Sequence, residues 1–233
     1  MPTKFYPHYD DSIKLEGYAS WEKEGKLPLI LIFPAWAGRD AFTLKKADML
    51  AKLGYLGFAA DLYGNGKVGK TKEENSKLME PFMKDRFLLQ KRMLAILEYA
   101  KTLPEADPNR VGAIGFCFGG LCALDLARSG AAVQGVVSFH GLLRGFEEEP
   151  KEIKTKVLAL HGYEDPMVPP TEVLAFAKEM SKAKADWQIH AYGKTLHAFT
   201  NPEANDPSFG TVYNATAEKR SLQAMKDFFA EIF

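Results

Sequence analysis

The sequence has few cysteines, no excess of charge of either sign and no long apolar run. Two cysteines among 233 residues exclude a disulfide-stabilised scaffold and favour the reduced thiols of the cytoplasm. Lys+Arg and Asp+Glu both number 30, which speaks against a nucleic-acid partner. The longest apolar stretch, LPLILIFPAWA, is interrupted by Pro34 and is too short to span a bilayer. The N-terminal segment has no apolar run after a basic start, so we expect no secretory signal and a cytoplasmic protein without a membrane partner.

Repeats, low-complexity tracts and linkers are also lacking, and a chain of this length is typical of one α/β domain. We therefore expect a single domain over residues 1–233. Continuous apolar runs, typical of strands covered on both faces, alternate with amphipathic helical stretches. The expected strands are 12–20, 28–34, 55–61, 110–116, 133–140, 156–162 and 186–192. The expected helices are 40–53, 72–101, with a break or kink at Pro81, 119–130, 170–183 and 214–232.

This alternation predicts an α/β fold with a mostly parallel, doubly wound sheet and helices on both faces. The first strand, 12–20, is the candidate for an antiparallel edge. In such sheets ligands bind beyond the carboxyl ends of the strands, so the chemistry is expected there.

A glycine-flanked cysteine lies where the strand 110–116 runs into the next helix. The stretch GFCFGG places Cys117 between Gly115 and Gly119, the spacing of a nucleophile elbow. Such a turn needs small flanking residues because strand and helix pass very close together. The helix that starts here favours a thiolate, and the Phe118 backbone N–H would face a developing oxyanion. The alternative is a tight turn with an inert buried cysteine.

Candidate partners follow in the order nucleophile, acid, base. In LHGYEDPMVPP, Asp165 follows a strand and is the better orienting acid, while the adjacent Glu164 is expected to point elsewhere. In GKTLHAFTNP, His197 lies on a loop after the last strand and is the expected base. The order Cys117, Asp165, His197 is that of α/β-hydrolases. Of the other histidines, His8 precedes the sheet and His190 lies inside a strand. His140 and His161 each end a strand.

The chain resembles the dienelactone hydrolase family of α/β-hydrolases. The likeness runs from LILIFPAWAGRDAF through AADLYG and GFCFGG to LHGYEDPMVPP and LHAF. The resemblance implies a Cys–Asp–His triad of Cys117, Asp165 and His197. It also implies a second oxyanion-hole donor, the backbone N–H of Trp36.

Departures from the family pattern bear on the substrate. Members that cleave dienelactone have a glutamate where this chain has Ala35, and an arginine four residues after the catalytic histidine, where it has Asn201. Their second carboxylate-binding arginine would fall in 72–83, which contains lysines but no arginine. Because a buried carboxylate without a charged partner is costly, dienelactone is not expected as the preferred substrate.

These residues predict hydrolysis of small neutral esters or lactones through a Cys117 acyl-enzyme, by a monomer or homodimer. Five residues could form an apolar pocket wall, with core packing as the alternative for the aromatic ones: Trp36, Phe139, His140, Leu142 and Phe199. No residue spacing indicates a metal or a cofactor. Phosphotriester or thioester hydrolysis, transfer to a non-water acceptor, and a non-catalytic ligand-binding or thiol-sensing role remain as alternatives. Cys122 is expected to be a buried helix residue, not a disulfide partner of Cys117.

Overall fold

The structure is a computed structural model that describes residues 1–233. It contains two compact units, Met1–Ile114 and Gly115–Phe233. The boundary between them falls inside one strand, β5 (Ala106–Phe116), so that this strand contributes residues to both units. The expectation of one domain over 1–233 stays a prediction.

In the first unit five strands pair in the order β1-β2-β4-β3-β5. β2 is antiparallel to β1 and to β4, whereas β3 and β4 are parallel. The expected antiparallel strand is confirmed, but β2 is not the edge, because β1 covers its outer side. The sequence did not predict β1, because Pro7 lies inside it and its buried alternate positions include the polar residues His8 and Asp10. The bounds are β1 (Thr3–Asp10), β2 (Ile13–Ser20), β3 (Leu27–Phe33) and β4 (Leu56–Ala59).

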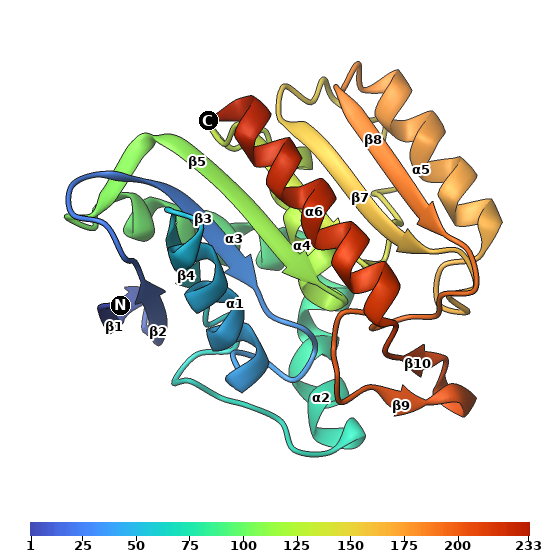
Figure 1. Ribbon diagram of the computed structural model, residues 1–233, viewed down its shortest axis with the longest axis horizontal. Coiled ribbons are helices and arrows are strands. Elements are labelled where there is room, and N and C mark those ends of the chain that lie inside the picture. The colour runs from blue at the N-terminus through green and yellow to red at the C-terminus, as the bar shows by residue number, and fades with distance from the viewer. The chain divides into compact units, whose positions relative to one another are not determined.

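Helices cover both faces of this part of the sheet (Figure 1). On one face, a Cβ at Gly57 would lie 2.7 Å from the Ala47 carbonyl of α1. Phe58, the next residue of β4, points to the other face, where its ring lies 6.2 Å from that of His8. His8 in turn stacks on Tyr99 of α3, with ring centroids 4.1 Å apart. The helices are α1 (Ala41–Lys52), α2 (Lys72–Lys84) and α3 (Arg86–Lys101).

The long helix expected over 72–101 is two helices, and the break is not at Pro81. Pro81 lies inside α2, which continues to Lys84. The break falls at Asp85, whose extended backbone ends α2 and whose side chain accepts from the Leu88 N–H to start α3. The capping carboxylate therefore decides the position of the break, as expected for an aspartate at a helix N-cap.

In the second unit three parallel strands pair in the order β6-β7-β8. A Cβ at Gly135 of β6 would lie 2.5 Å from the Ile232 side chain of α6. Ser138 points to the opposite face, where its Oγ would lie 2.7 Å from a Cβ at Gly120 of α4. The helices α6 and α4 thus cover opposite faces, as Figure 1 also shows. The bounds are β6 (Gly135–Phe139), β7 (Lys156–Gly162), β8 (Trp187–Tyr192), α4 (Phe118–Arg128), α5 (Pro170–Lys182) and α6 (Ala215–Ile232).

The predicted mostly parallel sheet with helices on both faces is confirmed. A short antiparallel pair, β9 (Asn205–Asp206) and β10 (Thr211–Val212), lies between β8 and α6 and was not predicted. Its two-residue strands are too short to give a periodic pattern. No helix combines the length and the apolar composition that crossing a bilayer requires.

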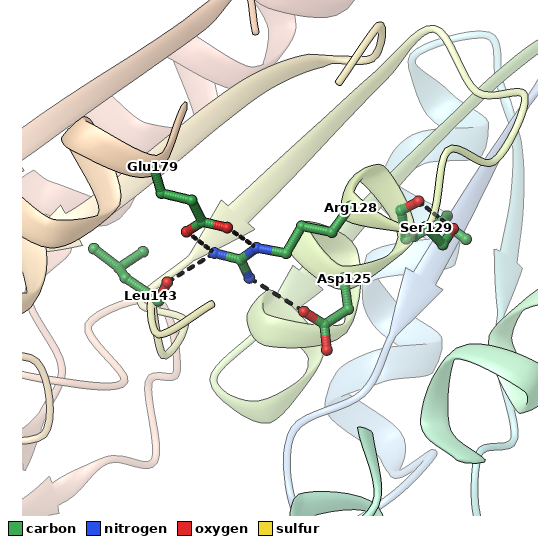
Figure 2. A network of polar contacts seen from close by, with 6 residues as sticks. Asp125, Arg128, Ser129, Leu143 and Glu179 are labelled. Atoms are coloured by element: carbon green, nitrogen blue, oxygen red, sulfur yellow. Dashed lines mark hydrogen bonds and ion pairs between the residues drawn. The ribbon is translucent and has the colours of Figure 1, made fainter. Parts of the chain in front are cut away.

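A buried arginine joins three segments of the second unit (Figure 2). Arg128 of α4 makes two hydrogen bonds, both of 2.8 Å, to the carboxylate of Glu179 in α5. It also bonds the Asp125 carboxylate at 3.1 Å and the Leu143 carbonyl at 2.9 Å. Four donor contacts from one side chain therefore hold the segment after β6 against the helix that begins at Phe118.

Candidate active site

Cys117 occupies a strained turn between β5 and α4. Its backbone angles, φ 56° and ψ −117°, lie in a region that residues other than glycine rarely adopt. The flanking glycines are required, because a Cβ at Gly115 would lie 1.8 Å from the carbonyl oxygen of Gly119. The expected close passage of strand and helix is confirmed. Cys117 is half-buried, and Cys122 is buried inside α4 and forms no disulfide, as expected.

Asp165 and His197 meet in the interior. The Asp165 Oδ2 lies 2.6 Å from the His197 Nδ1, and both side chains are at most 2% exposed. The second carboxylate oxygen, Oδ1, accepts from the Met167 backbone N–H at 2.8 Å. Glu164 points away, as expected, and accepts from the Lys194 backbone N–H on the surface. The carboxylate of Asp165 thus fixes the His197 ring and leaves its Nε2 as the free end for chemistry.

The charge of Cys117 acts directly on the His197 ring. Burial lowers the pKa of His197, but the negative charge of Cys117, the hydrogen bond with Asp165 and the interaction with the Cys117 side chain raise it to about 10. The Nε2 atom is buried and has no well-aligned hydrogen-bond partner. Catalytic contacts are often loose without substrate and tighten when it binds. The protonation of His197 is therefore coupled to the charge of Cys117 on one side and to Asp165 on the other.

The loops that carry the acid and the base are joined by backbone hydrogen bonds. The Glu164 N–H donates to the Thr195 carbonyl at 3.0 Å, and the Tyr163 N–H donates to the Tyr192 carbonyl at 2.9 Å. His197 itself donates to the Gly210 carbonyl and accepts from the Val212 N–H of β10. The two loops also pass very close together, because a Cβ at Gly162 would lie 2.6 Å from the carbonyl oxygens of both Thr195 and Leu196. The unpredicted β9–β10 pair therefore anchors the histidine loop.

Three residues expected in the pocket wall, Phe139, His140 and Phe199, are buried. Phe139 and Phe199 are 0% exposed, and the Phe139 ring stacks on Phe116 with centroids 4.7 Å apart. The His140 ring packs edge-on against both His197 and Phe199, each with centroids 5.1 Å apart. This packing favours the core alternative for Phe139 and Phe199. Leu142, by contrast, is half-buried.

The two expected oxyanion donors occupy helix-start and loop positions. Phe118 is the first residue of α4, where backbone N–H groups have no acceptor within the helix. Trp36 is half-buried in the loop after β3, and its carbonyl accepts a 2.8 Å hydrogen bond from the Tyr63 hydroxyl. Asn201, at the position of the family's arginine, accepts from the Glu203 N–H and is thus engaged locally.

Sequence reasoning missed Tyr63 and Thr200, the second of which hydrogen-bonds His140 at 2.8 Å. Tyr63 falls within the quoted AADLYG motif, so a signal for it existed, whereas nothing around Thr200 marks it. His161, one residue before the end of β7, is 2% exposed and neither ring nitrogen has a hydrogen-bond partner. Burial lowers its pKa, against the raising effect of Asp165. The His161 ring is therefore neutral, although the Asp165 carboxylate lies near it.

Comparison with known proteins places this geometry in a family. A protein of Aquifex aeolicus with the name "Putative carboxymethylenebutenolidase" is 29% identical over 201 residues, which cover 84% of this chain and 86% of that protein. An uncharacterised protein of Caenorhabditis elegans, K02A2.1, is 40% identical over 149 residues, 62% of this chain and 94% of its own. The crystal structure of the dienelactone hydrolase-like promiscuous phosphotriesterase P91, from metagenomic libraries, superposes with a TM-score of 0.94 at 34% identity. That match covers 100% of this chain and 98% of P91.

The match to P91 over the whole chain confirms the α/β-hydrolase fold, and the hydrolase class follows from the same set of relatives. The sequence profile described as "Dienelactone hydrolase family" matches residues 15–233. The chain therefore belongs to the dienelactone hydrolase family.

Proposed function

We propose that the protein hydrolyses small neutral carboxylic esters or lactones through an acyl-enzyme on Cys117, with His197 as base and Asp165 as orienting acid. The observation that carries this proposal is the pairing of His197 with Asp165 at 2.6 Å, together with the raised pKa that the Cys117 charge gives to His197. A buried imidazole held on one side by a carboxylate and charged by a thiolate on the other is the arrangement of an activated nucleophile.

In the first half of the reaction the Cys117 thiolate attacks the ester carbonyl carbon, and the carbonyl π electrons move to oxygen. The backbone N–H groups of Phe118 and Trp36 donate to this oxyanion, and each such donor typically contributes about 3 kcal/mol in the transition state. When the intermediate collapses, the C–O bond breaks and the leaving oxygen takes the proton of the His197 imidazolium. A thioester and a neutral His197 result.

In the second half the charge of the site has changed. The sulfur of a thioester is neutral, so the thiolate charge that raised the His197 pKa is gone. His197 can therefore accept a proton from water near neutral pH, and the resulting hydroxide attacks the thioester carbonyl. Collapse breaks the C–S bond, releases the carboxylic acid and restores the thiolate beside the imidazolium.

The absence of the family's carboxylate-binding residues supports a neutral substrate. Asn201 replaces one arginine and is engaged with the Glu203 N–H. A substrate carboxylate would lose its hydration without gaining a cation at the Asn201 position. Dienelactone is thus expected to be a poorer substrate than an uncharged lactone of similar size.

Phosphotriester hydrolysis is a second candidate, and one observation favours it. P91, 34% identical and superposable over the whole chain, is described as a promiscuous phosphotriesterase. The same thiolate would attack phosphorus in place of carbon, with expulsion of an aryloxide.

The test uses purified protein with acetyl and butyryl aryl esters, an uncharged lactone, dienelactone and an aryl phosphotriester. Cys117→Ala and Cys117→Ser are assayed beside it, and the covalent adduct is sought by mass spectrometry after acid quench. We expect turnover of the aryl esters, an acyl adduct on the peptide that contains Cys117, and no activity in the Ala variant. Equal turnover by wild type and Cys117→Ala would refute the mechanism, and no turnover of any substrate by the wild type would favour a non-catalytic, thiol-sensing role.

A further inference from the structure

His140 links the turn of the nucleophile to the loop of the base. Its Nδ1 lies 3.1 Å from the backbone nitrogen of Cys117, and its Nε2 lies 2.8 Å from the Thr200 Oγ1. The side chain is 2% exposed, so water does not compete for either contact. Thr200 follows His197 by three residues on the same loop. One ring therefore hydrogen-bonds the Cys117 backbone and the segment that carries His197.

These contacts fix the protonation state of the His140 ring. A backbone N–H can only donate, so Nδ1 must present its lone pair to Cys117. The proton of the neutral imidazole is then on Nε2, which donates to the Thr200 hydroxyl. A doubly protonated ring would place an N–H against the Cys117 N–H. The neighbouring His197 imidazolium, with ring centroids 5.1 Å apart, disfavours that second positive charge.

The hydrogen bond that the His140 Nδ1 accepts acts on Cys117, whose backbone conformation is strained. Cys117 has φ 56°, and its N–H is shared between the Phe139 carbonyl, at 3.0 Å, and the His140 Nδ1. Strained backbone persists only where its surroundings determine it strongly. His140 also has a positive φ, 39°, and its own N–H donates to the Leu160 carbonyl at 2.8 Å. The acceptor is thus itself held in place by β7.

We propose that His140 is a positioning residue, in the Nε2-protonated form, that holds the Cys117 turn and the His197 loop in the register needed for attack. It acts through the Cys117 backbone and through Thr200, and it leaves the proton transfers to His197. The inference rests on the proposed function for its effect on turnover, but the arrangement itself is testable without a substrate.

The test compares variants that keep one contact each. In His140→Asn the amide oxygen can replace Nδ1 as acceptor, and asparagine tolerates a positive φ. In His140→Gln the amide nitrogen can replace Nε2 as donor, and His140→Ala removes both contacts. Thr200→Val and Thr200→Ser form a second pair, in which only serine keeps the hydroxyl. His190→Asn, at an exposed histidine of β8, is the matched control.

Three measurements are made on folded variants: kcat and KM on the best ester, the rate of Cys117 alkylation by iodoacetamide, and the nitrogen NMR shifts of the His140 ring. We expect His140→Ala to lower kcat and alkylation by about 10- to 100-fold, the range for a misplaced reacting group, with KM nearly unchanged. His140→Asn should recover most of this loss and His140→Gln less. Thr200→Val should show a smaller loss that Thr200→Ser does not. The NMR shifts should show an unprotonated Nδ1.

The inference is wrong if His140→Ala keeps wild-type kcat and alkylation rate, if His140→Asn recovers nothing, or if Nδ1 carries the proton. If His140→Ala does not fold, the Asn and Thr200 variants decide by the same criteria. Should the wild type hydrolyse no ester or lactone, the proposed function fails alone, because alkylation and NMR still report on the Cys117 turn.

Discussion

At the scale of single residues, the charge state of the Cys117–His197 pair decides how the site responds to pH. The attraction that raises the pKa of His197 from 6.5 to about 10 equally favours the thiolate of Cys117. Between pH 6.5 and about pH 10 the folded protein therefore keeps a proton on His197 that the isolated side chain would lose. In the proposed mechanism the nucleophile is thus prepared before any substrate arrives.

We expect the alkylation rate of Cys117 by iodoacetamide to be nearly constant between about pH 6.5 and 9, whereas a free thiol becomes reactive as pH rises through about 8.5. The sign follows from the raised pKa: the imidazolium and its effect on sulfur persist until pH approaches about 10. In His197→Ala the profile should return to that of a free thiol. A tenfold rise per pH unit in the wild type would contradict an ion pair.

Tyr63 is expected to support the oxyanion loop. Its hydroxyl donates to the Trp36 carbonyl at 2.8 Å, and its ring stacks on Phe82 with centroids 6.0 Å apart. Tyr63→Phe removes the hydrogen bond and keeps the ring, which costs about 1 kcal/mol in the free energy of unfolding. If the Trp36 N–H holds the oxyanion, kcat should fall severalfold with little change in KM. Tyr9→Phe, at an exposed tyrosine, is the control in both assays.

The sequence could identify Cys117, Asp165 and His197 as candidate reacting residues because their signals are local. The glycines around Cys117 mark the turn, and the loops with Asp165 and His197 follow it in the order nucleophile, acid, base. The contacts that position them could not be predicted, because they join side chains and backbone across long intervals: Thr200 meets His140 60 residues away. Burial of Phe139 and Phe199 was equally beyond a pattern that cannot distinguish a pocket wall from a core.

At the scale of elements, prediction depended on the length of each segment. The strand 156–162 has the predicted bounds, because its apolar run ends at Gly162. The break between α2 and α3 was misplaced, since a proline is tolerated inside α2 while Asp85 caps the next helix. β9 and β10 escaped detection because two residues carry no periodicity, although they hold His197 in place.

The Arg128 network gives a stability prediction for α4 and its neighbours (Figure 2). Arg128→Met keeps the apolar stem but leaves the fully buried Asp125 carboxylate, and that of Glu179, without their cation. Breaking a buried ion pair in this way costs about 3–5 kcal/mol. Urea unfolding should show the loss.

The matched control is Arg110→Met, which breaks the more exposed Arg110–Asp107 pair. Exposed pairs of this kind contribute about 0–1 kcal/mol, so the free energy of unfolding should change little. Equal losses in the two variants would mean that the network does not stabilise α4.

At the scale of the whole molecule, the division into two units runs through a single strand. Ile114 and Gly115 are consecutive residues of β5, so separating the units would divide that strand. Cys117, Asp165 and His197 all belong to the second unit. The sequence, without any linker at this point, predicted one domain.

We therefore expect calorimetric unfolding of the full chain in one transition, with equal calorimetric and van't Hoff enthalpies. Residues 1–114 expressed alone should lack cooperative unfolding, because the strand is truncated. Two resolved transitions in the full chain would show that the units are independent domains.

The backbone bonds between the Asp165 loop and the His197 loop have a practical consequence for protein engineering. Because the Glu164 N–H and Thr195 carbonyl, among others, tie the two loops together, a change in either loop is transmitted to its partner. Libraries that seek new substrates should leave both loops intact and diversify positions such as the half-buried Leu142. Selected variants should then differ in what they accept while retaining the same proton-transfer apparatus.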